Sequence, residues 1–174
     1  MRILVLAGGE GRRIGGLKPQ RLLGGESLLD RALRFARAWS DEVEVADGGS
    51  DAPGIGGPLG AVAGALAKGG DFLTIACDMP FLPHDLAERL ARTEAAAALA
   101  ESGGRLHPVC ALWRARAADG LAAYLATGRR SLHGFAEAVG YEAVEWGTDP
   151  VDAFFNINDE DDLARAEAML SNAL

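Results

Sequence analysis

The N-terminal stretch that decides the fold reads RILVLAGGEGRRIGGLK from Arg2 to Lys18. Its first six residues are almost continuously apolar, which is typical of a strand buried on both faces, and Gly8-Gly9 ends that strand. The glycines allow backbone N–H groups to converge on an anion, and Arg13 and Lys18 add positive charge. Open α/β sheets bind ligands at the carboxyl ends of their strands. The stretch therefore predicts a phosphate-binding loop, against the alternative of a flexible turn with solvated arginines.

Two better-known glycine loops do not fit this spacing. A Walker loop requires Gly-Lys followed by Ser or Thr, whereas Gly16 is followed by Leu17 and only then by Lys18, with a proline next. The dinucleotide fingerprint fails because Ile14 stands in place of its third glycine. The fingerprint also needs an acidic residue about 20 positions later to bind the ribose. The acidic residue at that distance is Asp30, and it lies on a predicted helix.

The rest of the chain continues an alternation of strands and helices. Strands are predicted at 2–7, 42–46, 71–76, 95–100, 109–113 and 142–146, and helices at 27–39, 59–68, 86–92, 115–126, 131–139 and 159–170. Alternation in the first 92 residues favours parallel strands joined by right-handed crossovers. The alanine-rich segment 95–100 is assigned to a strand because a hairpin-like turn follows it. We expect a single three-layer Rossmann-like α/β domain over 1–174, with a mostly parallel twisted sheet, helices on both faces and an antiparallel strand near the C-terminal half.

Composition and charge narrow the classes of function. The 174 residues are 49% hydrophobic and 24% charged, with two cysteines, so neither a disordered chain nor a disulfide scaffold is expected. Residues 1–21 hold five basic side chains and one acidic side chain, a local charge of +4 against −12 for the other 153 residues. One small basic island favours a compact anion over nucleic acid. No stretch is long enough for a membrane span or fits a signal peptide, so we expect a cytoplasmic protein without membrane or nucleic-acid partners.

Six short motifs follow one another along residues 3–163. They are LAGGEGRRIG followed by Lys18, GPLG from Gly57, CDMPFLP from Cys77, HP at His107, GRRS from Gly128 and FNIND from Phe155. In this order they resemble the molybdenum cofactor guanylyltransferases. The resemblance implies transfer of GMP from GTP to the phosphate of molybdopterin, with release of pyrophosphate. It also suggests molybdoenzymes or cofactor chaperones as protein partners.

Asp78 is the candidate metal ligand. It follows the predicted strand 71–76, whose carboxyl end faces the same crevice as the first loop, so its carboxylate can hold Mg²⁺ against triphosphate oxygens. The alternative is a structural carboxylate that caps the turn before Pro80. The neighbouring Cys77 is interpreted as a small buried hydrophobe rather than a nucleophile.

The predicted nucleotide site combines the loop with the resemblance. Its members are Leu6, Ala7, Gly8, Gly9, Lys18, Asp51, Gly57, Pro58 and Asp78, and catalysis is assigned to Arg13, Lys18 and Asp78. An acceptor phosphate is already anionic, so alignment and charge neutralisation suffice without a general base.

The chain departs from the family pattern at two places in this site. Leu17 stands where the family has Asp before the lysine, and about ten residues replace a helix and a strand before Gly57. Asp51 is the nearest match to a family carboxylate that precedes Gly-Pro-Leu, and an Asx-turn role is the alternative for it.

A second group is predicted to bind the acceptor. It comprises His107, Arg129, Arg130, Asn156 and Asn158. Arginines match phosphate by a planar fork, and asparagines suit a polar heterocycle such as a pterin. The structural alternatives are that the arginines complement a helix end and that the asparagines satisfy a turn before the last helix.

Two alternative classes of function stay open, and a third is disfavoured. The first is a cytidylyltransferase for the same cofactor or a sugar-1-phosphate nucleotidyltransferase, although Gly8-Gly9 favours guanylyl transfer. The second is a non-catalytic nucleotide-binding homologue. An oxidoreductase Rossmann domain is disfavoured by the failed fingerprint.

Overall fold

The protein is described here from a computed structural model, which covers residues 1–8, 18–48 and 52–172. Six strands form one sheet in the order β4-β1-β5-β7-β6-β8, and β2 and β3 form a separate two-stranded hairpin. The strands are β1 (Arg2–Leu6), β2 (Leu22–Leu23), β3 (Glu26–Ser27), β4 (Val43–Ala46), β5 (Phe72–Ala76), β6 (Ala97–Ser102), β7 (Arg105–Trp113) and β8 (Tyr141–Trp146). The α-helices are α1 (Leu28–Trp39), α2 (Gly57–Ala67), α3 (Leu86–Ala91), α4 (Ala118–Ala126), α5 (Leu132–Val139) and α6 (Glu160–Asn172).

The sheet is mostly parallel, as predicted. Strand β1 pairs in parallel with β4 and β5, and β6 pairs in parallel with β8. Strand β7 is the exception, because it runs antiparallel to both β5 and β6. It is joined to β6 by Gly103 and Gly104, whose φ angles of 54° and 73° give the tight hairpin that the Ser-Gly-Gly-Arg sequence predicted. The antiparallel strand predicted in the C-terminal half is therefore confirmed.

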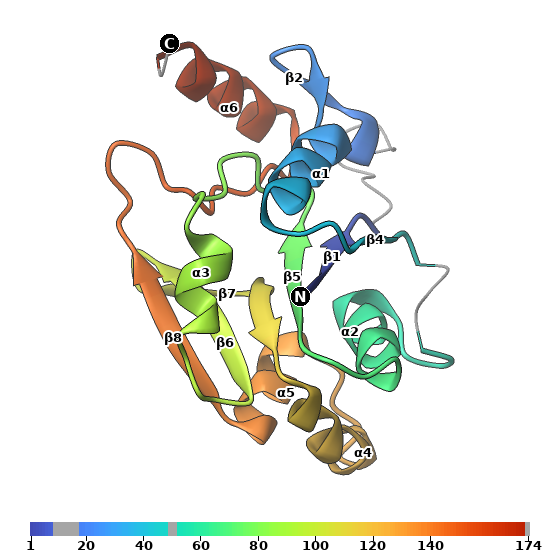
Figure 1. Cartoon of the computed structure of the whole chain (residues 1–174). Helices are drawn as coiled ribbons and strands as arrows, with labels where there is room; N and C mark the ends of the chain where they lie inside the picture. Colours follow the sequence, from blue (N-terminus) through green and yellow to red (C-terminus); the bar gives the residue numbers. More distant parts are fainter. Residues whose placement is uncertain (9–17, 49–51, 173–174) are drawn as a thin grey trace.

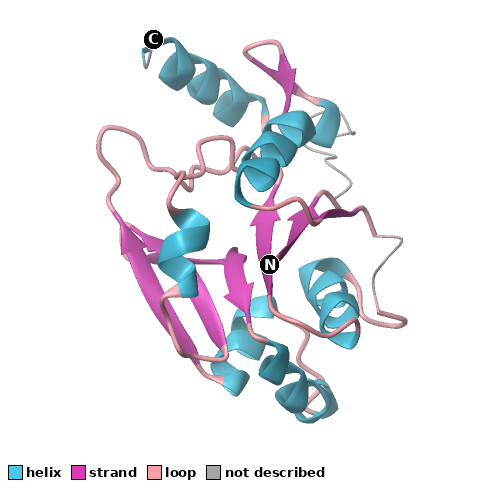
Figure 2. Ribbon diagram, in the orientation of Figure 1, coloured by secondary structure: helices cyan, strands magenta, loops and turns pink. Residues whose placement is uncertain are grey.

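Helices cover both faces of the sheet, which confirms the three-layer prediction (Figure 2). Side-chain alternation along β1 explains this arrangement, because Ile3 and Val5 pack in the core with α1 and α3, whereas Leu4 and Leu6 pack in the core with α2, α4 and α5. Both faces of β1 and β5 are buried, so apart from Arg2 and the buried Thr74 these strands are apolar instead of alternating. The central strands are thereby fixed, and their carboxyl ends emerge at one edge of the sheet.

Helix α1 begins where the sequence predicted. The Oγ atom of Ser27 accepts a hydrogen bond of 3.0 Å from the N–H of Asp30, which satisfies one of the free donors at the helix start.

Several local elements differ from the prediction. Strand β7 begins at Arg105 rather than at 109, so it includes His107. Residues 115–117 form a 3-10 turn rather than the first turn of α4. The β2–β3 hairpin was not predicted at all, since each of its strands has only two residues.

The β2–β3 hairpin packs against the last helix of the chain. Leu23 and Leu28 are buried with Ile157 and Ala166 in a small core of their own. The N–H of Gly24 also donates a hydrogen bond of 2.9 Å to Glu167 on α6. Figure 1 shows α6 and β2 side by side at one end of the molecule, with α4 and α5 at the other.

Candidate nucleotide-binding site

The carboxyl ends of β1 and β5 lie next to each other. Leu6 pairs with Ala76, and the N–H of Cys77 donates a 3.1 Å hydrogen bond to the carbonyl oxygen of Leu6. On the other side of β1, Ala7 N–H donates to the carbonyl of Ala46 at 2.9 Å. The chain leaves the sheet at Gly8, which is exposed. Strand pairing therefore brings the start of the predicted phosphate loop to the same edge as the residue after Cys77.

Lys18 and Asp78 meet at this edge. The Nζ atom of Lys18 lies 2.6 Å from Oδ2 of Asp78, and the two side chains are only 15% and 20% exposed. Lys18 begins a 3-10 turn that ends at Gln20, and Asp78 is the second residue after β5. The sequence predicted that a basic loop residue and an acidic residue after the third long strand would share one rim, and this proximity is confirmed. Their catalytic roles stay predictions.

The other predicted nucleotide ligands divide into two sets. Gly9, Arg13 and Asp51 lie outside the described residues. Gly57 and Pro58 form the first turn of α2, which has no side-chain cap. The free N–H groups and positive dipole end of such a helix start favour an anion.

The segment before α6 contacts Asp78 through the backbone. The N–H of Ile157 donates a 2.9 Å hydrogen bond to the carbonyl oxygen of Asp78, which places Asn156 and Asn158 on either side of that contact. Among the described residues, no donor reaches the buried Oδ1 atom of Asn156. The backbone N–H of Asn158 donates to Asp162 at 3.0 Å, which ties the segment to the start of α6. An unpartnered buried amide oxygen favours a ligand that supplies a donor.

His107 is buried and contacts Ser102 and Phe154. Only 6% of the residue is exposed, and its Nε2 atom lies 2.9 Å from Oγ of Ser102. The imidazole stacks on the ring of Phe154, with 4.9 Å between centroids and 13° between planes. Burial lowers the pKa of His107, an effect that the carboxylate of Asp152 opposes, so the ring is neutral at pH 7. Because Phe154 lies two residues before Asn156, the 154–158 segment joins His107 to the Asp78 edge.

A β-bulge in β7 lies directly after His107. Leu99 on β6 pairs with Ala111 of β7, yet the next residue, Ala100, pairs with His107, so three β7 residues from Pro108 onward bulge out of the ladder. A bulge of this kind turns the strand locally, and it accommodates a proline that cannot donate to the ladder.

Arg129 and Arg130 are not brought into this group. The guanidinium of Arg129 pairs with Glu137 at 3.3 Å and lies over the ring of Tyr124, while Arg130 donates to the carbonyl of Leu125 at 2.9 Å. All of these partners belong to α4 and α5, at the end of the molecule away from α6 (Figure 1). Their predicted part in acceptor binding stays a prediction. The bond from Arg130 to the last turn of α4 agrees with the structural alternative, in which the arginines complement a helix end.

The two cysteines do not qualify as nucleophiles. Burial raises the pKa of both Cys77 and Cys110 to about 12, so neither thiol ionises near neutral pH. This agrees with the interpretation of Cys77 as a small buried side chain.

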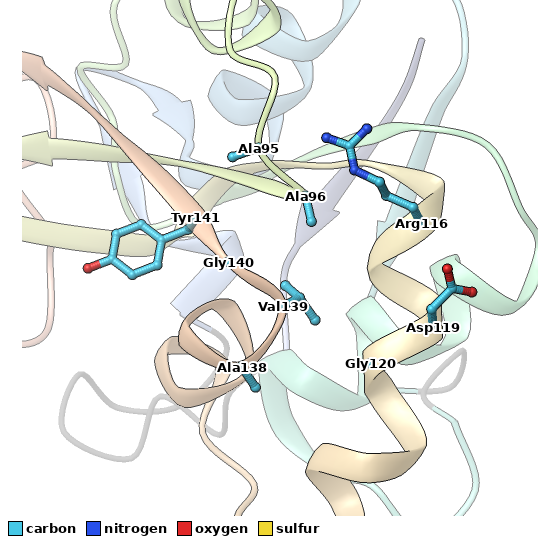
Figure 3. Close-up of a pocket in the computed structure, with 9 residues that line it drawn as sticks. All are labelled: Ala95, Ala96, Arg116, Asp119, Gly120, Ala138, Val139, Gly140 and Tyr141. Atoms are coloured by element: carbon cyan, nitrogen blue, oxygen red, sulfur yellow. The ribbon is translucent and has the colours of Figure 1, made fainter.

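A separate open pocket of about 660 Å³ lies elsewhere (Figure 3). It lies at the amino ends of β6 and β8, with Val139 between Arg116 and Asp119 on one side and Tyr141 on the other. None of the residues predicted for nucleotide or acceptor binding lines it. The predicted nucleotide site therefore lies apart from this pocket, at the Lys18–Asp78 edge.

Ser102, which no motif of the sequence singled out, contacts the predicted site residue His107. The signal was present in the two-glycine turn, because that turn places Ala100 opposite His107 and hence Ser102 on the same face, one diagonal step away.

The sequence and fold of the chain are similar to those of known proteins. A family model described as the MobA-like NTP transferase domain matches residues 3–140, which contain all of β1 but Arg2, together with Lys18, Asp78 and His107. The chain belongs to this family. A molybdenum cofactor guanylyltransferase from Cereibacter sphaeroides is 42% identical over 186 aligned residues, covering 96% of this chain and 95% of that protein. Another of the same name from Acidiphilium cryptum is 39% identical, covering 97% and 94%.

A solved structure also supports the family assignment of this MobA-like protein. The molybdopterin-guanine dinucleotide biosynthesis protein A from Archaeoglobus fulgidus superposes with a TM-score of 0.75 at 26% identity, over 99% of this chain and 100% of that one. The protein is therefore a transferase enzyme of the nucleotidyltransferase class, as the motifs indicated. No helix within the described residues is both long and apolar enough to cross a membrane.

Proposed function

We propose that the protein transfers GMP from GTP to the phosphate of molybdopterin and releases pyrophosphate. The main structural support is the Lys18–Asp78 pair. Here the ammonium of a lysine from the glycine-rich region and the carboxylate of an aspartate after β5 lie 2.6 Å apart, between Nζ and Oδ2. The name shared by relatives at 39–42% identity supports GTP and molybdopterin as the substrates.

The residues at this edge support binding and charge neutralisation of a triphosphate. Gly8, which follows β1, and the start of α2 at Gly57 are proposed to offer backbone N–H groups to phosphate oxygens. Lys18 places its ammonium where negative charge develops as the α-phosphorus is attacked, and Arg13 is proposed to assist it. The attacking phosphate is already an anion, so no side chain needs to remove a proton.

The donor set fits Mg²⁺, which we propose as the divalent metal. The ion is held in proteins by one or two carboxylates together with water and substrate phosphates. Asp78 is such a single carboxylate, and among the described residues Lys18 engages its Oδ2 atom and none donates to Oδ1, which is proposed to hold the metal. Among the described residues, no three His, Cys, Asp or Glu side chains cluster as a metal site of their own, which suits an ion that arrives with the nucleotide. When bound, the metal neutralises phosphate charge and acts as a Lewis acid.

The acceptor is proposed to lie against His107 and the 154–158 segment. The free amide oxygen of Asn156 suits a heterocycle that carries N–H donors, as a pterin does. His107 lies on the adjoining strand, and both residues connect to Asp78 through the hydrogen bond at Ile157. Asn158 is proposed to assist Asn156. The product would then pass to a molybdoenzyme or a cofactor chaperone in the cytoplasm, a location that suits two unpaired thiols.

Product formation with mass detection tests the proposal directly. Wild-type protein, Mg²⁺ and molybdopterin are incubated with each of the four nucleoside triphosphates, and the dinucleotide product is identified. We expect product with GTP and a loss of at least about a hundredfold in Asp78→Asn, because the Mg²⁺ ligand is removed. Asp41→Asn, an exposed carboxylate before the amino end of β4, is the matched control and keeps full activity.

The alternative functions give different results in the same experiment. Product with CTP and none with GTP would establish a cytidylyltransferase. Transfer to a sugar 1-phosphate and not to molybdopterin would place the protein with the sugar nucleotidyltransferases. Unchanged product formation by Asp78→Asn would refute the assigned chemistry.

A further inference from the structure

The Ser102–His107 contact joins two buried polar side chains on one hairpin. Ser102 is 2% exposed and His107 is 6% exposed, and Oγ lies 2.9 Å from Nε2. Within the described part of the chain, Ser102 is the only residue hydrogen-bonded to the imidazole, and His107 is the only hydrogen-bond partner of the Ser102 hydroxyl. The protonation of the ring and the direction of the hydroxyl are therefore set by each other.

The direction of this hydrogen bond follows from the cost of unpaired groups. A serine hydroxyl carries one hydrogen and two lone pairs, and a neutral imidazole carries one N–H and one bare nitrogen. If Nε2–H donated to Oγ, the hydroxyl hydrogen would be buried with no acceptor among the described residues. A buried donor left unsatisfied costs about 1–3 kcal/mol. A hydrogen on Nδ1 does not carry this cost, because Nδ1 is not among the fully buried, unpartnered polar atoms of the described residues and can bond to water or a ligand. The balance therefore favours a hydroxyl that donates to Nε2 and a ring hydrogen on Nδ1.

We propose that Ser102 is a positioning residue that holds neutral His107 in the Nδ1–H form, so that the ring presents a hydrogen-bond donor to the acceptor substrate. The substrate part of this inference rests on the proposed function, whereas the form of the ring does not. A donor at this place suits a phosphate or carbonyl oxygen, and it rejects a group that needs an acceptor. The stack on Phe154 and the bulge that begins at Pro108 hold the plane of the ring, so the tautomer is the remaining variable.

Nitrogen-15 NMR of the whole protein tests the tautomer without any substrate. Long-range correlation spectra separate protonated from bare ring nitrogens, and His107→Gln identifies the His107 signals among the three histidines. We expect a proton on Nδ1 and a bare Nε2 in the wild type at pH 7.5. In Ser102→Ala the ring is expected to populate the other tautomer, whereas Ser102→Thr, which keeps a hydroxyl, retains the wild-type pattern. Ser171→Ala on α6 is the control and leaves the His107 signals unchanged.

Steady-state kinetics then tests the effect on the acceptor. We expect Ser102→Ala to raise KM for molybdopterin about tenfold, since one hydrogen bond to a charged group is lost. KM for GTP should change by less than about twofold, because the triphosphate edge does not contact Ser102, and Ser102→Thr should restore most of the acceptor KM.

The two experiments separate the failure of each idea. A wild-type ring with its proton on Nε2, or a tautomer that does not respond to Ser102→Ala, overturns the inference. An equal rise of both KM values also overturns it, because that result indicates a general structural loss. If wild-type protein makes no dinucleotide from molybdopterin, the proposed function fails, and the NMR result still decides whether Ser102 sets the ring.

Discussion

The Lys18–Asp78 pair should contribute measurably to stability in the absence of ligands. At 2.6 Å the attraction of two unit charges is about 1.6 kcal/mol in water and about 6.4 kcal/mol at an effective dielectric constant of 20. Side chains that are 15% and 20% exposed lie between these limits, and their desolvation offsets part of the gain. We therefore expect a coupling free energy of about 2 kcal/mol, above the 0.2–1 kcal/mol that is typical of exposed pairs.

A double-mutant cycle measures this coupling. Lys18→Met, Asp78→Ala and the double variant are unfolded in urea, and the free energies of unfolding are combined so that only the pairwise interaction is left. The stability losses of the two single variants should add up to more than the loss of the double variant. The reason is that each single variant leaves one partly buried charge without a partner, whereas the double variant removes both charges. Arg92 and Glu88, a helix pair that is 70% and 68% exposed, provide the control cycle, with an expected coupling below about 0.5 kcal/mol.

Two outcomes would refute this reasoning. A coupling for Lys18 and Asp78 no larger than that of the exposed helix pair would show that the two charges do not meet in solution. A coupling that disappears in about 0.5 M NaCl would show that the pair is solvated, since buried pairs are screened much less than exposed ones.

Three further predictions concern stability and reactivity. Because burial lowers the pKa of His107, the folded chain binds fewer protons than the unfolded chain below about pH 6.5, so the free energy of unfolding should fall as pH drops below 6.5, by at most about 1.4 kcal/mol per unit; His107→Gln should flatten this part of a urea-unfolding series, and an identical slope in the variant would contradict the assignment. With pKa values of about 12, Cys77 and Cys110 should resist a disulfide reagent at pH 8 and react only in denaturant, and prompt labelling of the native protein would count against their burial. Ser27→Ala should lower the free energy of unfolding by about 1 kcal/mol through loss of the cap, whereas a change below about 0.3 kcal/mol would mean that the hydroxyl does not cap α1 in solution.

The sequence was sufficient for those parts of the fold that depend on strand order and burial. The apolar run after Arg2 and the run before Asp78 are both buried on two faces, so their pairing and the meeting of Lys18 with Asp78 could be predicted from topology alone. The alanines of β6 have low strand propensity, but their place before the Gly103–Gly104 turn outweighed it, and they are fully buried between two strands.

The sequence was insufficient where short or non-local contacts decide the structure. The two-residue strands of the β2–β3 hairpin have no periodicity to detect, and they are stabilised by α6, more than a hundred residues away. Arg129 and Arg130 match a motif, yet whether a guanidinium reaches a ligand or its own helix end depends on side-chain geometry that spacing does not contain. The bulge at Pro108 is likewise a property of the paired sheet and not of either strand.

The packing of α6 on the β2–β3 hairpin has a consequence for how the enzyme is made. The hairpin follows Lys18 directly, so the support of a residue near the start of the chain depends on a helix translated after every strand of the sheet. During synthesis the central strands can assemble before α6 leaves the ribosome, but Leu23 then lacks the part of its apolar cover that Ile157 and Ala166 supply. A nascent chain would thus acquire its architecture first and its competence for nucleotides last.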